Sequence, residues 1–168
     1  MQTAIHTAYL LIGGNLGNRF SNLQMATEMI EKQCGSIAQQ SSIYETAAWG
    51  LTEQPDFLNQ VLVLHTNLAP ATLMQQLLLI ENSMGRERSV KMGPRIIDID
   101  ILLIDELIID TPLLRLPHPA LPLRRFALLP LAEVAPNVMH PVEKKPICQL
   151  LKDCKDHLNV QKITAPTA

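Results

Sequence analysis

An alternating segment at residues 96–103 most strongly limits how this chain can fold. It reads Ile-Ile-Asp-Ile-Asp-Ile-Leu-Leu and follows a Gly-Pro-Arg turn. Successive side chains of a β-strand point to opposite faces, so Asp98 and Asp100 share one face. Three isoleucines share the other face: Ile97, Ile99 and Ile101. The segment therefore predicts a strand that buries its isoleucine face and presents two carboxylates on the opposite face.

The carboxylates of Asp98 and Asp100 repel each other unless a counter-charge lies nearby. Mg²⁺ suits this role, because it takes few protein carboxylates and completes its coordination with waters and phosphate oxygens. Arg95, just before the strand, adds a guanidinium suited to phosphate. A solvated strand face is the alternative interpretation of the same spacing. The apolar continuation through residues 102–104 favours a central strand, and we therefore expect a Mg-nucleotide site.

Strand and helix signals alternate along the chain before this segment. Expected strands, in chain order, cover residues 7–12, 36–45, 57–66 and 97–103. One helix is expected from a capping box at Ser21 and Gln24 to near Gly35, and another from Pro70 to Gly85. This order predicts an α+β fold with a ferredoxin-like βαββαβ core, an antiparallel sheet and helices on its faces. Extra C-terminal helices are expected at 124–135, kinked or restarted at Pro130, and at 146–154.

Length and composition limit the class of protein further. The 168 residues fit a single domain over 1–168, with a core at about 7–156 and a loose tail after 162. A hydrophobic content of 47% with 18% charged residues is typical of a globular chain. The net charge of −2, without a run of basic residues, gives no electrostatic support for nucleic-acid binding.

Targeting and cysteine signals indicate the compartment. No apolar run approaches the roughly 20 residues that a membrane span needs, and Gly13 interrupts the first apolar run, unlike a signal peptide. The three cysteines have no zinc-like spacing and fit a reducing compartment. We therefore expect a cytoplasmic, stand-alone domain that binds neither membranes nor nucleic acid.

Other candidate sites have structural alternatives. The basic stretch at 85–91 is typical of an exposed loop, but beside two carboxylates it also suits closure over a nucleotide. The glycine-rich segment at 13–17 fits neither common nucleotide motif and predicts a tight strand-to-helix turn. His118, held between two prolines, is either structural or a positioned hydrogen-bond donor. Trp49 lies beside Gly50 in an expected loop and suits stacking on a flat ligand.

Several separated blocks of sequence occur in an order shared with one enzyme family. The strongest block, Lys91 to Leu102, has a basic residue, one variable position, Gly-Pro-Arg, two variable positions and Asp-aliphatic-Asp-aliphatic-aliphatic. The other blocks are residues 14–16, 44–50, 54–59, 117–119, 124–126 and 130–131. Together they resemble 6-hydroxymethyl-7,8-dihydropterin pyrophosphokinase, an enzyme family of folate biosynthesis.

The resemblance implies a ferredoxin-like core and transfer of pyrophosphate from ATP to the pterin hydroxymethyl group, leaving AMP. It implies that Asp98 and Asp100 hold two Mg²⁺ ions, and that these aspartates act in catalysis with Arg86 and Arg95. It implies nucleotide contacts by Glu81, Arg88, Arg95, Ile101, Arg115, His118 and Arg124. It implies pterin contacts by Thr46, Trp49, Gly50, Phe57, Asn59, Asp98 and Phe126.

Two other functions are compatible with the same residues. Another two-metal nucleotidyltransferase on a similar core would release free pyrophosphate. A non-catalytic, ferredoxin-like sensor would bind a small molecule without turnover. Of these functions we expect the pyrophosphokinase, as a monomer that acts on two small-molecule substrates, ATP and 6-hydroxymethyl-7,8-dihydropterin.

Overall fold

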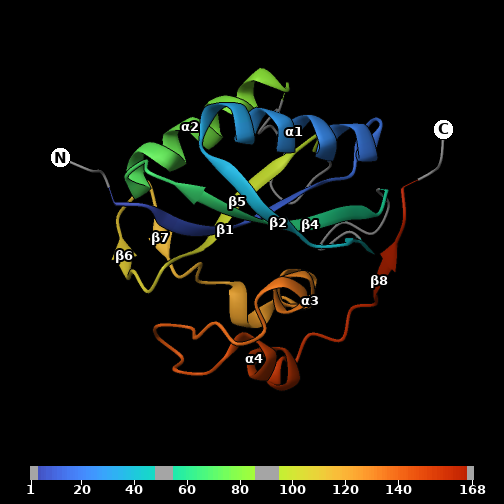
Figure 1. The fold of residues 1–168 in the computed structure, drawn as a ribbon. Helices are drawn as coiled ribbons and strands as arrows, with labels where there is room; N and C mark the ends of the chain where they lie inside the picture. The colour runs from blue at the N-terminus through green and yellow to red at the C-terminus, as the bar shows by residue number, and fades with distance from the viewer. Residues whose placement is uncertain (1–3, 48–54, 86–94, 166–168) are drawn as a thin grey trace.

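A six-stranded antiparallel sheet forms the centre of the molecule (Figure 1). The computed structural model describes residues 4–47, 55–85 and 95–165. The strands of the sheet are β1 (His6–Gly14), β2 (Ser36–Gln40), β3 (Ile43–Thr46), β4 (Phe57–Thr66), β5 (Asp98–Ile104) and β8 (Val160–Ile163). They lie in the order β5-β1-β4-β3-β8, with β2 also paired to β4. A separate two-stranded sheet contains β6 (Ile109–Asp110) and β7 (Arg115–Leu116).

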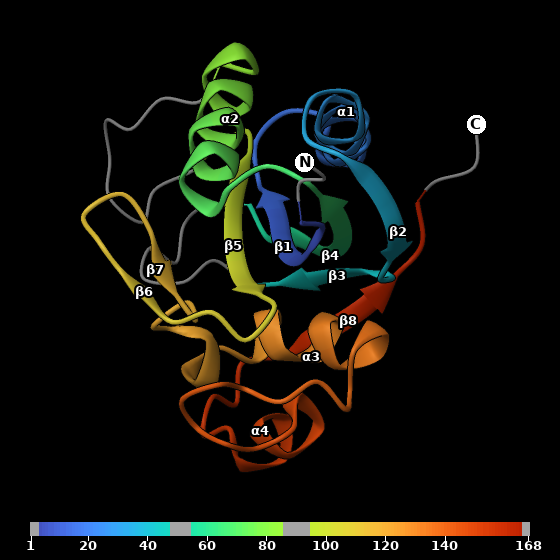
Figure 2. The ribbon, with the colours of Figure 1, turned by 60° about the vertical axis from the view of Figure 1, so that its left-hand side comes forward.

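Helices cover both faces of the central sheet (Figures 1 and 2). Helices α1 (Arg19–Gln33) and α2 (Pro70–Ser83) lie on one face, and α3 (Arg125–Val134) and α4 (Ile147–Asp153) lie beyond the other. A short 3-10 helix, Leu121–Leu123, precedes α3. The prediction of an antiparallel sheet with helices on its faces and extra C-terminal helices is therefore confirmed. None of the helices in the described parts of the chain is long and apolar enough to cross a membrane.

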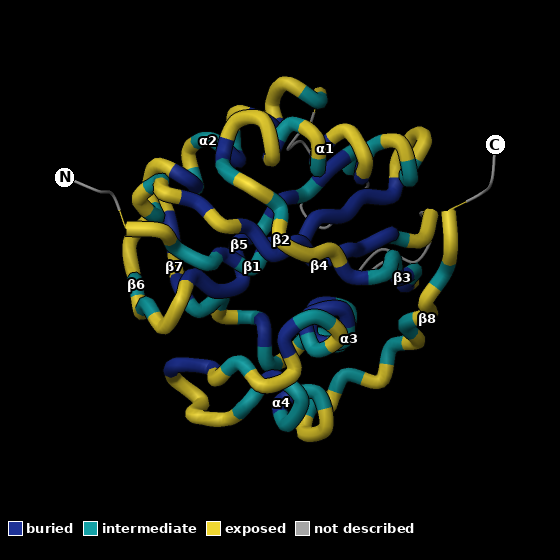
Figure 3. Tube along the Cα trace, viewed as in Figure 1, coloured by how far each residue is buried: buried dark blue, intermediate teal, exposed yellow. Residues whose placement is uncertain are grey.

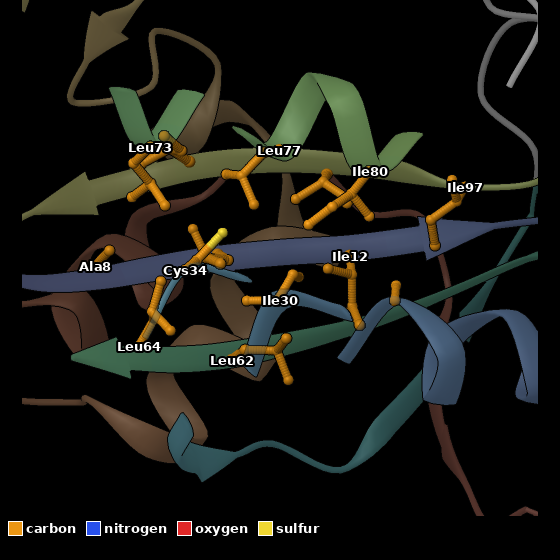
Figure 4. Packing of buried hydrophobic residues seen from close by; sticks show 14 of the residues in the cluster. Ala8, Ile12, Ile30, Cys34, Leu62, Leu64, Leu73, Leu77, Ile80 and Ile97 are labelled. Atoms are coloured by element: carbon orange, nitrogen blue, oxygen red, sulfur yellow. The ribbon is translucent and has the colours of Figure 1, made fainter. Parts of the chain in front are cut away.

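The sheet separates two hydrophobic clusters. Figure 3 shows where buried residues lie along the strands and the helices. The cluster beneath α1 and α2 includes Ile97, Ile99 and Ile101, together with apolar residues spaced three and four apart on both helices. Figure 4 shows Leu73, Leu77 and Ile80 of α2 packing over the sheet beside Ile12 and Ile97. The second cluster contains Leu11, Val61 and Leu102 and packs against α3 and α4. The isoleucine face of β5 is therefore buried as its alternation predicts.

Three local predictions were wrong, and one strand, β8, was not predicted. The α1 cap is Asn18, whose side chain accepts a hydrogen bond from the Ser21 N–H, so Ser21 does not begin the helix. Strand β1 continues through Gly14. The segment 36–45 forms two strands, because β2 ends before Ser41. The Ser41 N–H donates a hydrogen bond to the Val61 carbonyl oxygen, and the Ser41 Oγ accepts one from the Val61 N–H. The C-terminal segment forms β8 through Ile163, paired with β3. Helix α3 continues through Pro130 as one helix, so it does not restart there, and the alternative of a kink stays a prediction.

Helix α3 is held to the sheet by the carboxylate of Glu133. Its oxygens accept hydrogen bonds from the Tyr44 hydroxyl at 2.5 Å and from the Ser42 N–H and Oγ at 2.9 and 3.1 Å. Lys162 Nζ of β8 lies 3.9 Å from the same carboxylate. Burial alone would raise the pKa of Glu133, but the hydrogen bonds from Tyr44 and Ser42 outweigh it and lower the pKa.

Stability should therefore depend on Glu133 in a defined direction of pH. Because the folded pKa lies below the unfolded one, the contribution is complete above the unfolded pKa and disappears as pH falls through the folded pKa. We expect Glu133→Gln to lower the free energy of unfolding by about 1–3 kcal/mol at pH 7. Denaturant titrations from pH 7 to pH 3 should show this difference shrinking. Glu106→Gln, at an exposed glutamate, is the control; a wild-type-like Glu133→Gln at pH 7 would contradict the assignment.

Candidate active site

One pocket opens on the face of the sheet that carries the two aspartates. Strands β1, β3, β4 and β5 and the start of α3 all contribute to it. Its lining residues are Leu11, Gly13, Thr46, Ala47, Phe57, Asn59, Arg95, Asp98, Asp100, Arg124 and Phe126. Eight of these belong to the predicted site, and they include every described residue that was expected to bind the pterin or act in catalysis.

The register of the antiparallel strands explains this gathering. Gly13 of β1 lies opposite Asp98 of β5 on one side and opposite Asn59 of β4 on the other. Directly opposed residues share a face, so an amide and a carboxylate flank a residue without a side chain. Leu11 is likewise opposite Asp100, one step along the same face. Residues far apart in sequence therefore form the floor of one pocket.

Two consecutive glycines permit the strands to approach closely. A Cβ on Gly13 would lie 2.3 Å from Asn59 Oδ1 and 2.5 Å from the Leu58 carbonyl oxygen. A Cβ on Gly14 would lie 2.2 Å from the Ile96 carbonyl oxygen. Both residues belong to β1, and neither has a positive φ. The prediction of a turn was wrong for this pair, since the absence of a side chain, not backbone freedom, is what the site requires.

The charged groups of the pocket are arranged around its aromatic rings. Arg95 Nη1 lies 2.5 Å from Asp98 Oδ2, and both side chains are about three-quarters buried. The Arg95 guanidinium also lies 5.5 Å from the centroid of the Phe57 ring. Arg124 lies 5.6 Å from the centroid of the Phe126 ring. Two guanidinium groups and two carboxylates thus surround a site with aromatic surface, which suits a flat ligand joined to phosphate.

The donor set of Asp98 and Asp100 fits a hard divalent cation. Both carboxylates are partly buried on one strand face and line the same pocket. Across the ranges 4–47, 55–85 and 95–165, no group of three or more His, Cys, Asp or Glu side chains is placed to hold a metal. Two carboxylates with room for waters and phosphate oxygens is the set that Mg²⁺ accepts. A soft-metal site would need sulfur or imidazole ligands instead.

Four of the predicted nucleotide contacts do not line this pocket, and two of them, Glu81 and Ile101, lie in the core. Glu81 of α2 is only 3% exposed and accepts a hydrogen bond from the Ile99 N–H at 2.6 Å, so it ties α2 to β5. Ile101 is 2% exposed and belongs to the cluster beneath α1 and α2. Ile101 thus belongs to the buried face of β5, opposite the aspartates, and Glu81 contacts β5 from α2. Their contact with a nucleotide stays a prediction.

His118 and Arg115 line a second pocket, beside the β6–β7 hairpin and His140. The pKa of His118 is lowered by burial and, further, by the positive charges of Arg124 and Arg115. Its Nδ1 accepts a hydrogen bond from the Ala120 N–H at 3.1 Å, which fits a neutral ring with its proton on Nε2. Arg115 Nε lies 3.3 Å from Asp110 Oδ1. The charge of Arg124, which lines the first pocket, thus acts on His118 in the second pocket.

Four predicted residues fall outside the described residues: Trp49, Gly50, Arg86 and Arg88. Three lining residues were not predicted: Leu11, Gly13 and Ala47. Leu11 and Gly13 are two residues apart and so share a strand face, a signal that was available once β1 was known to continue. Ala47 directly follows Thr46 and had no chemical signal of its own.

Known proteins resemble this chain over most of its length. The sequence profile of 7,8-dihydro-6-hydroxymethylpterin-pyrophosphokinase (HPPK) matches residues 9–136. The 2-amino-4-hydroxy-6-hydroxymethyldihydropteridine pyrophosphokinase of Aquifex aeolicus is 44% identical over 141 residues, covering 84% of this chain and 88% of that protein. The protein of that name from Pseudomonas aeruginosa is 36% identical over 151 residues, covering 89% of this chain and 93% of the other.

A solved structure shares the fold. The crystal structure of Plasmodium falciparum HPPK-DHPS wild type with pteroate superposes with a TM-score of 0.75 at 17% identity. The match covers 91% of this chain and 43% of the Plasmodium chain. At this identity the likeness concerns the fold alone. With the profile match and two relatives covered over most of their length, the conclusion is that this chain belongs to the 7,8-dihydro-6-hydroxymethylpterin-pyrophosphokinase family.

Proposed function

We propose that the chain transfers pyrophosphate from Mg-bound ATP to 6-hydroxymethyl-7,8-dihydropterin. The observation that carries the proposal is one pocket with two chemical halves. Phe57, Phe126 and Asn59 offer aromatic faces and an amide edge, while Arg95 and the two aspartates offer charge. A flat, hydrogen-bonding heterocycle needs the first half, and a metal-bound polyphosphate needs the second.

The half of the pocket with Phe57, Phe126 and Asn59 is assigned to the acceptor, the pterin, from the burial and position of its residues. Asn59 is 6% exposed, so a ligand that reaches its amide exchanges hydrogen bonds in a site largely closed to water. Thr46 of β3 is opposite Phe57 of β4, which places both on the same face beside the amide. In this proposal Phe57 and Phe126 stack on the pterin, and Asn59 binds its polar edge.

The donor half brings the reacting groups together. Asp98 and Asp100 would hold the two Mg²⁺ ions, which when bound neutralise the phosphate oxygens. Arg95 and Arg124 would orient the triphosphate in line with the acceptor hydroxyl. The hydroxyl oxygen then forms a bond to the β-phosphorus, the bond from that phosphorus to the oxygen shared with the α-phosphate breaks, and AMP leaves. The hydroxyl proton passes to the medium.

The strand order supports the finer assignment of fold as well. Strands β5, β1 and β4 are neighbours in that order, and β2 pairs with β4 on its far side. With α1 and α2 on one face, this order supports a ferredoxin-like βαββαβ core to which β8 and the C-terminal helices are added.

The proposal is tested by the identity of the nucleotide product. Purified protein is incubated with ATP, Mg²⁺ and 6-hydroxymethyl-7,8-dihydropterin, and the nucleotides are separated by chromatography. We expect one AMP for each acceptor consumed, no AMP without acceptor, and no product after chelation of Mg²⁺. ADP as the product, or folded protein that binds the pterin and forms no nucleotide product, would defeat the proposal; the second outcome would favour a sensor.

A further inference from the structure

Asn15 joins two edges of the pocket that are distant in sequence. Its Nδ2 donates a hydrogen bond to the Pro55 carbonyl oxygen at 2.9 Å. Its Oδ1 accepts a hydrogen bond from the Arg95 N–H at 2.8 Å, and its own N–H donates to the Arg95 carbonyl oxygen at 2.9 Å. Asn15 is only 2% exposed although it follows the end of β1. A single buried side chain therefore links the segment before β4 to the segment before β5.

The linked segments carry the pocket's own side chains. Pro55 is two residues before Phe57, and Arg95 is three residues before Asp98, to which its guanidinium is paired at 2.5 Å. The Arg95 guanidinium also lies over the Phe57 ring. The separation of ring and guanidinium thus depends on the backbone positions of Pro55 and Arg95, both of which hydrogen-bond to Asn15.

An asparagine side chain is specifically suited to this contact. Its amide supplies one donor and one acceptor at the same short reach, and here each has a backbone partner of the opposite kind. Aspartate would keep the acceptor for the Arg95 N–H and lose the donor to the Pro55 oxygen. Alanine would lose both and leave the Pro55 carbonyl oxygen and the Arg95 N–H without this partner.

We propose that Asn15 is a positioning residue that sets Arg95 and Phe57 at the spacing needed for transfer. The inference rests on the proposed function, because it assumes that Arg95 acts on phosphate and Phe57 on the acceptor. Asn15 does not line the pocket. It acts through Arg95 on the rate of transfer, and through the Pro55–Phe57 segment on the affinity for the acceptor.

A double-mutant cycle tests the route through Arg95. We expect Asn15→Ala to lower kcat about 10- to 100-fold, since small displacements of a positioning group have effects of this size. In the Arg95→Ala background the same change should lower kcat by no more than about twofold, because the group it positions is already absent. Purely structural damage would instead give the full loss in both backgrounds, and that additivity would overturn the inference.

Asn22→Ala is the matched control. Asn22 Nδ2, near the start of α1, donates to the Leu16 carbonyl oxygen at 3.0 Å, an amide-to-backbone bond made with neither Pro55 nor Arg95. The Leu16 N–H donates to the Arg95 carbonyl oxygen at 3.2 Å, and this backbone bond does not use the Asn22 side chain. We expect wild-type kcat for this variant. Asn15→Asp provides a second comparison: acceptor affinity measured by calorimetry should fall at least about tenfold, with a smaller change in kcat than Asn15→Ala shows.

Hydrogen exchange separates this inference from the proposed function. The backbone N–H of Arg95 should exchange at least about ten times faster in Asn15→Ala than in the wild type. Its exchange rate should be unchanged in Asn22→Ala. If the wild type forms no AMP, the proposed function falls, and the exchange rate still decides whether Asn15 holds Arg95. Unchanged exchange in Asn15→Ala, or in Asn15→Ser should the alanine variant not fold, would overturn the inference.

Discussion

Asp100→Asn is expected to lower turnover by about a thousandfold or more while leaving the protein folded. Asparagine keeps the size of the side chain and removes its charge, so the packing of β5 beside Leu11 is retained and the cation loses a ligand. Asp98→Asn should have at least as large an effect, because it also removes the ion pair with Arg95. The rate of AMP formation at saturating ATP and acceptor measures the loss.

Asp105→Asn is the control for these variants. Asp105 follows the far end of β5 and pairs with His6 at 2.7 Å, away from the pocket. Its φ of 48° is one that asparagine adopts readily, so the control should fold and turn over normally. Thermal unfolding and circular dichroism of all three variants establish that they are folded. Near-normal turnover of Asp100→Asn would show that the carboxylate pair does not hold the metal.

Gly13→Ala should produce the second large effect, on acceptor binding. A Cβ at this position would lie 2.3 Å from Asn59 Oδ1 and 2.5 Å from the backbone oxygen of Leu58, so the amide cannot keep its place. We expect the dissociation constant for the dihydropterin to rise on the order of a hundredfold, because a misplaced buried amide is left unpaired against the ligand. Overpacking should also lower the free energy of unfolding by about 1–3 kcal/mol.

Gly14→Ala is the informative comparison, since its Cβ would meet the Ile96 carbonyl oxygen at 2.2 Å and not Asn59. This variant should disturb the segment of Arg95 and therefore weaken ATP binding or turnover more than acceptor affinity. Calorimetric titration of each variant with each ligand makes the contrast measurable. Wild-type acceptor affinity in Gly13→Ala would contradict the role given to the glycine.

Patterns within a single element predicted the strand of the two aspartates correctly. The alternation of isoleucine and aspartate over 96–103 determines which side chains share a face, whatever the neighbouring strands are. The same holds for α2, where Pro70 begins the helix and residues three and four apart meet the sheet. The prediction that Phe57, Asn59, Asp98 and Phe126 form one site came from the family resemblance. The register of the strands explains why three of them, Phe57, Asn59 and Asp98, lie together.

Features that depend on pairing between distant segments were not predictable from one sequence. Strand β8 has only four residues, two of them exposed and polar. It forms because it pairs with β3 at the edge of the sheet. The need for Gly13 follows from its partner Asn59 across the sheet, and a glycine pair alone indicates a turn equally well. Asn15 likewise acquires its role only when Pro55 and Arg95 lie on either side of it.

Phosphorus NMR of the complete reaction tests the central claim most directly. The protein is supplied with ATP, Mg²⁺ and 6-hydroxymethyl-7,8-dihydropterin, and the fate of each phosphorus atom is followed. The account predicts that the α-phosphorus appears in AMP, while the β- and γ-phosphorus atoms appear together as a diphosphate ester on the pterin. Free inorganic pyrophosphate with the α-phosphorus on the pterin, or a single phosphate on the pterin with ADP, would contradict it.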